Sequence, residues 1–254
     1  MNVHVKKSKH KGWMYEVIIS VTWIVLLVFA FFGRLINIAI KQNNQSLDFD
    51  GQFLGEVVYF TVWVLAFNIC YFTYKVVLSV RREVLPANNW LNILFVSLNF
   101  ISFLVYVPTW AMGQQVAFTG WDGYYKTIVE HILMPIFAIL YFTLMSRPET
   151  NIKYILRNSW QTTLFMFVYM FYITIRRVII HSPRIGEEHI SSWIGTFPYT
   201  MVDPFAIGWV GYMCAFIAIT TFVYGISVFV GYIGLIVGKS WEKKLKDKKD
   251  FCYL

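Results

Sequence analysis

The chain has 254 residues, of which 57% are hydrophobic and 19% aromatic, whereas only 14% are charged. Soluble domains carry about 25% charged residues, so this composition excludes an ordinary soluble enzyme, a disordered chain and a small disulfide-stapled secreted module. The formal net charge of +8 would favour nucleic-acid binding only if it lay on one folded surface. The composition therefore predicts an integral membrane protein.

Six apolar segments are long enough to cross a membrane core about 30 Å thick, which takes about 20 helical residues. Charged residues mark most of their ends, and the loops between them are short. We therefore predict an all-α polytopic membrane protein, a bundle of six transmembrane helices in a single domain over residues 1–254. The approximate predicted spans are 15–36, 55–76, 90–112, 126–146, 157–178 and 206–237.

The placement of lysine and arginine predicts the orientation. With the N-terminus inside, sixteen basic residues lie on the inner side and six on the outer side. Because cytoplasmic loops carry an excess of basic residues, we expect both termini to be cytoplasmic. The basic tail Lys243–Lys249 then predicts a contact with anionic lipid headgroups, and nucleic-acid binding is the weaker interpretation of the same charges.

One histidine lies inside a predicted span. His131 stands in the sequence Val129-Glu130-His131-Ile132-Leu133-Met134-Pro135. An ionisable group within the membrane is a functional candidate, and neutral imidazole is a general base near pH 7. The alternative is a histidine that packs by a hydrogen bond to a neighbouring helix.

The second span carries a polar stripe. Thr61, Asn68 and Lys75 are seven residues apart, so they share one helix face. A threonine within a helix ordinarily bonds the carbonyl four residues earlier, here that of Val57. A catalytic role would instead need a base at the same depth.

The topology offers such a base. Thr61 lies five residues beyond Glu56 and His131 five residues beyond Lys126, and both spans are entered from the predicted outer side. At the rise of an α-helix, both side chains lie about 8 Å below their points of entry. Matching depth is required for a Thr–His pair but does not establish contact.

Charged residues near the predicted outer rim are candidates for binding a substrate. An arginine there can clamp a carboxylate or phosphate headgroup, whereas many such residues only anchor the helix at the interface. Together with Asn68, the substrate-binding candidates are Arg34, Arg176 and Asp203.

We expect neither a metal nor another cofactor. The sequence contains no H-E-x-x-H helix, nucleotide-binding loop, haem-attachment motif or G-x-S-x-G elbow. The loop residues His181, Glu187, Glu188 and His189 match no standard zinc spacing.

Three short segments resemble the androgen-induced family of six-pass membrane hydrolases and its bacterial six-pass relatives. They are Tyr59-Phe60-Thr61, with Asn68 downstream; His131 followed by Pro135; and Phe197-Pro198-Tyr199 through Asp203, followed by Gly208-Trp209. The number and order of the spans agree over about Tyr15 to Gly238.

The resemblance implies a function. Animal members of that family hydrolyse fatty acid esters of hydroxy fatty acids with a threonine nucleophile and a histidine, and by position these would be Thr61 and His131. We therefore predict an intramembrane lipid-ester hydrolase, located in the plasma membrane, whose partners are membrane lipids. The alternatives are a non-enzymatic protein that binds or transports a lipid or small ligand, and a structural subunit that pairs with other membrane proteins.

Overall fold

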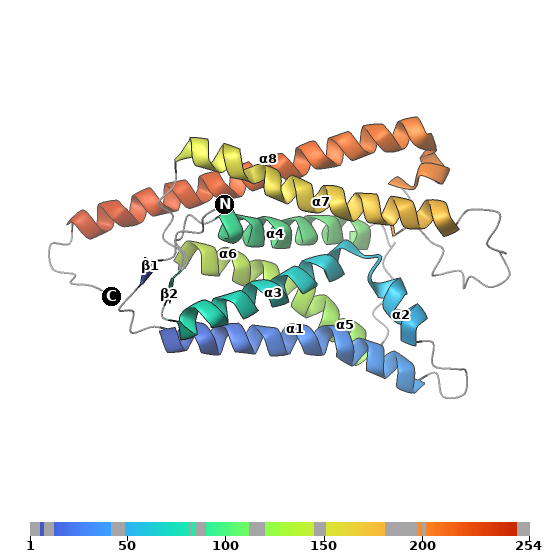
Figure 1. The fold of residues 1–254 in the computed structure, drawn as a ribbon, viewed down its shortest axis with the longest axis horizontal. Coiled ribbons are helices and arrows are strands. Elements are labelled where there is room, and N and C mark those ends of the chain that lie inside the picture. The colour runs from blue at the N-terminus through green and yellow to red at the C-terminus, as the bar shows by residue number, and fades with distance from the viewer. Residues whose placement is uncertain are drawn as a thin grey trace.

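The apolar segments fold into long helices that lie side by side (Figure 1). The structure, a computed structural model, describes residues 6–7, 13–41, 49–81, 83–84, 90–111, 120–144, 151–180, 198–199 and 202–247. In chain order the elements are β1 (Lys6–Lys7), α1 (Trp13–Lys41), α2 (Phe49–Glu56), α3 (Phe60–Val80), β2 (Glu83–Val84), α4 (Trp90–Ala111), α5 (Trp121–Ile128), the π-helix η1 (Val129–Leu133), α6 (Met134–Leu144), α7 (Ile152–Ile180) and α8 (Pro204–Asp247).

Six helical stretches among the described residues are long and apolar enough to cross a membrane, which confirms the all-α polytopic bundle. The fourth stretch is composite and runs through α5, η1 and α6. Several helices extend past the predicted spans, since α5 begins at Trp121 and α7 at Ile152. A helix satisfies its own backbone hydrogen bonds, so it continues beyond the apolar segment that defines the span.

Helix α4 lies at the centre of the bundle. It contacts α3 and α6 on one side and α7 and α8 on the other. All residues from Asn92 to Asn99 are buried, so its polar side chains must find partners inside the protein. The α1–α3 and α7–α8 pairs make the most extensive contacts and flank this central helix (Figure 1).

The first and last helices bring their terminal ends to the same end of the bundle. Helix α1 begins and α8 finishes there (Figure 1). A short antiparallel ladder pairs Lys6 with Val84 and Lys7 with Glu83. The side of the membrane on which this end lies stays a prediction, so we call it the predicted inner end and the opposite end the predicted outer end.

Local sequence explains how α8 starts. Asp203 accepts a hydrogen bond from the Phe205 N–H at 3.0 Å and so caps the helix, and Pro204 occupies the first helical position. The backbone leaves helical geometry at Gly208, where φ is 76° and ψ is 157°. A side chain is strained at such a φ, so the glycine permits a kink that separates the first turn of α8 from its long apolar part.

Candidate functional site

Glu56 is the centre of an ion-pair cluster at the predicted outer end. Its carboxylate receives the Arg34 Nε at 2.8 Å and the Lys126 Nζ on its other oxygen. Glu56 is only 8% exposed. Burial alone would raise its pKa, but the Lys126 ammonium and the Arg34 guanidinium outweigh burial and hold the pKa of Glu56 below its ordinary value. The cluster joins α1, α2 and α5 through charge.

A second carboxylate tightens the same region. Asn37 on α1 donates to Asp122 on α5 at 2.6 Å. The adjacent Gly123 lies against Arg34, because a Cβ at this glycine would be 3.4 Å from an Arg34 nitrogen. Helices α1 and α5 therefore meet closely just where Arg34 reaches Glu56.

Glu130 is buried without a hydrogen-bond partner among the described residues. It is 5% exposed, and neither carboxylate oxygen forms a hydrogen bond there. It lies one turn after Lys126, whose ammonium interacts with it electrostatically. A buried carboxyl group that makes no hydrogen bond is costly in a membrane span and marks this turn as a functional candidate.

His131 lies in a π-helical turn that Pro135 helps to explain. Proline has no N–H, and its ring crowds the carbonyl four residues earlier, which here belongs to His131. Just before the proline, the Met134 N–H bonds the Val129 carbonyl five residues back, as in a π-helix. Such turns occur often at functional sites.

Tyr106 of α4 holds the His131 ring. Their ring centroids are 4.0 Å apart with an angle of 13° between the planes. His131 is 7% exposed, and its Nδ1 is buried with no hydrogen-bond partner in the described part of the chain. The imidazole is therefore held by stacking, and among the described residues its Nδ1 makes no hydrogen bond to a neighbouring helix.

Thr61 is the second residue of α3 and is half-buried. The bond to Val57 expected of an ordinary helical threonine is absent, because α3 begins only at Phe60 and the Val57 carbonyl accepts the Trp63 indole N–H at 2.9 Å. Within the described residues Thr61 forms no side-chain hydrogen bond, and none joins it to His131. Among the described residues, the Thr61 hydroxyl therefore makes no structural hydrogen bond.

The amide pair Asn68–Asn99 fixes the alignment of α3 with α4. Each side chain donates to the other, at 2.9 and 3.0 Å, and Tyr71 donates to Asn92 at 2.8 Å. The partner numbers fall on α4 as they rise on α3, as they must for antiparallel helices. The amide nitrogen and the amide oxygen of Asn68 both bond to Asn99, so this residue couples α3 to α4. Its role in substrate binding stays a prediction.

The same alignment places Thr61 level with His131. Thr61 precedes Asn68 by seven residues and Tyr106 follows Asn99 by seven. Each therefore lies about 10 Å from the amide pair, towards the predicted outer end and on the helix face of its own asparagine. Because Tyr106 stacks on His131, the threonine and the histidine share one depth in the bundle.

The segment before α8 lies against the start of α3. The Tyr169 hydroxyl donates to the Val58 carbonyl at 2.8 Å, and it also interacts with the Tyr199 hydroxyl. Burial raises the pKa of Tyr199 to about 12, so the phenol stays neutral at physiological pH. Tyr199, from the third segment that carries the family resemblance, therefore interacts with Tyr169 of α7 and with the backbone of Phe60, from the first segment.

The remaining predicted site residues have structural partners. Asp203 receives the Arg177 Nη2 at 2.9 Å and the Arg177 Nε at 3.3 Å, a two-pronged contact that ties α7 to the start of α8. Arg34 is committed to Glu56. Arg176, the neighbour of Arg177, is half-buried near the end of α7. These residues ring the predicted outer end, and their roles in substrate binding stay predictions.

The other end of the polar stripe forms a separate cluster. Lys75 pairs with Glu16 of α1 at 2.7 Å, and the same carboxylate accepts the Tyr141 hydroxyl at 2.8 Å and the Ser79 hydroxyl at 3.2 Å. These groups lie at the predicted inner end, beyond the Asn68 amide pair. They satisfy one another and so hold α1, α3 and α6 together.

The sequence analysis did not predict the Glu56–Lys126 pair, because Lys126 served only to mark the end of a span. The sequence nevertheless contains a pattern that indicates this pair. Lys126 and Glu130 are four residues apart, so they share a helix face, and Glu56 precedes the neighbouring span that is entered from the same side. Charges at matching span ends are candidates for an ion pair.

Comparisons with family models, with curated proteins and with solved structures found no match to this chain. The resemblance to the androgen-induced family stays a prediction that rests on its short motifs. Among the described residues, no group of three or more histidine, cysteine or acidic side chains is arranged to hold a metal ion. The loop residues His181, Glu187, Glu188 and His189, and the side chains of the basic tail, lie outside what the structure describes.

Proposed function

We propose that the protein is an intramembrane lipid-ester hydrolase with Thr61 as nucleophile and His131 as base. The observation that carries the proposal is the shared depth of the two residues, counted from the Asn68–Asn99 hydrogen bonds. The uncommitted Thr61 hydroxyl supports it as well. We further propose the plasma membrane as its location and membrane lipids as its substrates.

The proposed reaction has two steps. The Thr61 hydroxyl oxygen attacks the ester carbonyl carbon while its proton passes to a nitrogen of His131. The alcohol then leaves with that proton, and the acyl group stays on Thr61 as a new ester. Water attacks this ester with His131 as base, which releases the fatty acid and restores the threonine hydroxyl.

The ring stack gives His131 the fixed orientation that such a base requires. A neutral imidazole at a buried position accepts a proton only if the ring faces the nucleophile, and Tyr106 limits its rotation at a centroid distance of 4.0 Å. Thr61 and His131 are expected to approach each other when a lipid ester fills the site.

The test is labelling of the purified protein by a fluorophosphonate or activated-ester probe. Thr61→Ala and His131→Phe should abolish labelling, because one removes the nucleophile and the other removes the ring nitrogens while it retains a ring to stack on Tyr106. Thr73→Ala is the matched control on the same helix, since the Thr73 hydroxyl bonds the Ile69 carbonyl at 2.8 Å and is remote from the site.

A second pair of variants tests the stack. Tyr106→Phe keeps the aromatic ring and should retain most labelling, whereas Tyr106→Leu should lower its rate by at least tenfold by freeing the imidazole. Labelling that persists unchanged in both Thr61→Ala and His131→Phe would contradict the proposal. Hydrolysis of a panel of lipid esters by the unlabelled wild-type protein, with Thr61→Ala as the inactive control, identifies the substrate.

A further inference from the structure

Two side chains bind the carbonyl oxygens that would otherwise continue α3 back towards α2. The Trp63 indole N–H donates to the Val57 carbonyl at 2.9 Å, and the Tyr169 hydroxyl of α7 donates to the Val58 carbonyl at 2.8 Å. In a continuous helix each of these carbonyls would accept the backbone N–H four residues later. Side-chain donors therefore occupy the break between α2 and α3.

The backbone hydrogen bonds around this break are those of a turn. The Tyr59 N–H bonds the Glu56 carbonyl and the Val62 N–H bonds the Tyr59 carbonyl, each at 3.1 Å and each across three residues. Tyr59 itself is extended, with φ −81° and ψ 134°. Among the described residues, the Thr61 N–H bonds no carbonyl. Helix α3 is therefore a separate helix and does not continue α2.

The local sequence does not require the break. Residues 57–62 read Val-Val-Tyr-Phe-Thr-Val and contain neither glycine nor proline, the residues that interrupt a helix most strongly. Valine and threonine lower the helix propensity only slightly. Tertiary contacts must therefore stabilise the break, and the bonds from Trp63 and Tyr169 are contacts of this kind.

Tyr169 is a centre of contacts at the start of α3. Its side chain is buried, and its ring meets the Phe60 ring edge-on at 5.2 Å and the Trp63 ring edge-on at 5.9 Å. Its hydroxyl also interacts with the backbone of Phe60. One side chain thus contacts Val58, which precedes α3, and the first and fourth residues of the helix.

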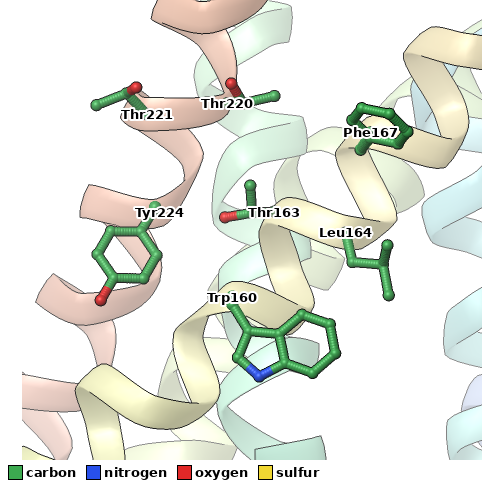
Figure 2. Close-up of a pocket in the computed structure, with 7 residues that line it drawn as sticks. All are labelled: Trp160, Thr163, Leu164, Phe167, Thr220, Thr221 and Tyr224. Atoms are coloured by element: carbon green, nitrogen blue, oxygen red, sulfur yellow. The ribbon is translucent and has the colours of Figure 1, made fainter.

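Helix α7 holds Tyr169 in a fixed position because α7 is itself bound to α8. On its outer face Trp160 and Phe167, together with Tyr224 of α8, line a shallow apolar depression (Figure 2). The Tyr224 hydroxyl donates to the Leu156 carbonyl of α7 at 3.2 Å. Tyr169 is buried and contacts α3, so α7 uses one face for α8 and the other for the start of α3.

The consequence for Thr61 concerns its hydroxyl proton. A threonine within a span ordinarily donates this proton to its own helix, as Thr73 does to the Ile69 carbonyl at 2.8 Å. A proton that is held by a carbonyl is not available to a base. For Thr61 the corresponding carbonyl is that of Val57, which lies outside α3 and accepts the Trp63 indole N–H.

We propose that Trp63 and Tyr169 are positioning residues for Thr61. They hold the break before α3 and so keep the threonine hydroxyl free to give its proton to a base. Without them α3 extends towards α2, and the Thr61 hydroxyl bonds the Val57 carbonyl as in an ordinary helix. The proposal rests on the proposed role of Thr61 as the nucleophile.

The kinetic test follows fluorophosphonate labelling of the purified full-length protein in detergent. Trp63→Phe and Tyr169→Phe should each lower the maximal labelling rate about three- to tenfold, the effect of one hydrogen bond. The half-saturating probe concentration should stay unchanged, because the variants alter the nucleophile and not the lipid contacts. Tyr224→Phe is the matched control, since it also removes a bond from a tyrosine hydroxyl to a backbone carbonyl of an adjacent helix, and it should label as the wild type does.

A second readout does not depend on hydrolysis. NMR of the protein in detergent measures hydrogen exchange at the Thr61 amide. In the double variant Trp63→Phe with Tyr169→Phe the helix should extend, so the Thr61 N–H gains the Val57 carbonyl and exchanges at least tenfold more slowly. A simple loss of packing would instead speed this exchange.

The outcomes separate this inference from the proposed function. Unchanged or faster exchange in the double variant, or a maximal labelling rate of Tyr169→Phe equal to that of Tyr224→Phe, would overturn the inference. Labelling of Thr61→Ala at the wild-type rate would overturn the hydrolase and with it the catalytic role of the break. The exchange measurement would then still decide whether Trp63 and Tyr169 hold the break.

Discussion

Single residues show how the bundle tolerates charge in its interior. Glu56 pairs with two cations, whereas Glu16 pairs with one cation and accepts hydrogen bonds from two hydroxyls, and each carboxylate bridges several helices. A buried ion pair adds little stability compared with apolar packing, but the loss of one partner leaves an uncompensated charge. Glu130 and His131 depart from this pattern, because neither makes a hydrogen bond among the described residues at its buried atoms.

The Glu56 cluster gives a prediction at this scale. Lys126→Met should destabilise the protein by about 3–5 kcal/mol, since it removes the ammonium that compensates a buried carboxylate. Thermal unfolding in detergent measures the loss. The double variant Lys126→Met with Glu56→Gln should recover much of it, and Lys153→Met, at an exposed position, should change little. Equal losses from Lys126→Met and Lys153→Met would contradict this account.

The pH dependence of the same variant is a second readout. Because the cations lower the pKa of Glu56 in the folded protein, the pair contributes stability above the ordinary carboxyl pKa of 4.5 and loses it as the pH falls through the lowered pKa. The wild type should therefore exceed Lys126→Met in melting temperature at neutral pH, and the difference should shrink in acid. Arg34, Asp122 and Glu130 also face this pair, so they remain unchanged in the comparison.

Helices are joined by contacts that differ in kind. Polar groups join α1 to α3 and α3 to α4, and close approach at Gly231 adds to the hydrogen bonds that join α7 to α8. A Cβ at Gly231 would lie 2.6 Å from Ile155 Cγ2, closer than two carbon atoms can approach. Ile155 is β-branched and fully buried, so its side chain cannot rotate away.

Gly231→Ala should therefore destabilise the α7–α8 pair by about 1–3 kcal/mol, the usual cost of overpacking. Gly225→Ala on the same helix is the matched control, because a Cβ there meets nothing within 4 Å. Melting temperatures in detergent compare the two. Adding Ile155→Ala, which removes both γ-carbons that the new Cβ would meet, to Gly231→Ala should restore part of the loss. A Gly225→Ala variant as unstable as Gly231→Ala would argue against this packing.

The elements themselves were largely predictable. Apolar length and charged ends locate six spans, because a segment in lipid must satisfy its backbone bonds as a helix. Helix ends were less accurate, as at Trp121 and Ile152, because helical hydrogen bonding continues into polar sequence. The π-turn over Val129–Leu133 was not predicted, although Pro135 gave a local reason for a break there.

At the scale of the whole molecule, the positive-inside rule predicts which end of the bundle faces the cytoplasm. A fluorescent protein fused to the C-terminus should fluoresce in a bacterial host, since it folds in the cytoplasm and not after export. Alkaline phosphatase fused after Ala111, in the loop between α4 and α5, should be active because that loop is predicted to lie outside. The opposite pattern at both positions would reverse the orientation, and the candidate site would then open to the cytoplasm.

The candidate site could be predicted only in part. Thr61 and His131 could be predicted from residue type, from the span in which each lies and from depth. Each of these is read within one span, since depth is the number of residues from the end of the span multiplied by the helical rise. The stacking of Tyr106 on His131 was not predicted, because the sequence of a span does not reveal which neighbouring helix each of its residues faces. The bond from Trp63 to Val57, which leaves the Thr61 hydroxyl uncommitted, depends on where α3 begins.

The sequence by itself determined that this chain is a helical membrane protein with six spans, since the cost of unpaired backbone and charge in lipid fixes span number and polarity. Only the tertiary structure decided which polar residues are partners. Glu56 with Lys126, Asn68 with Asn99, and Asp203 with Arg177 each join helices whose relative rotation is not encoded in any one span. Side-chain packing sets that rotation, because many rotations bury a similar apolar area but few of them also pair the buried charges and amides.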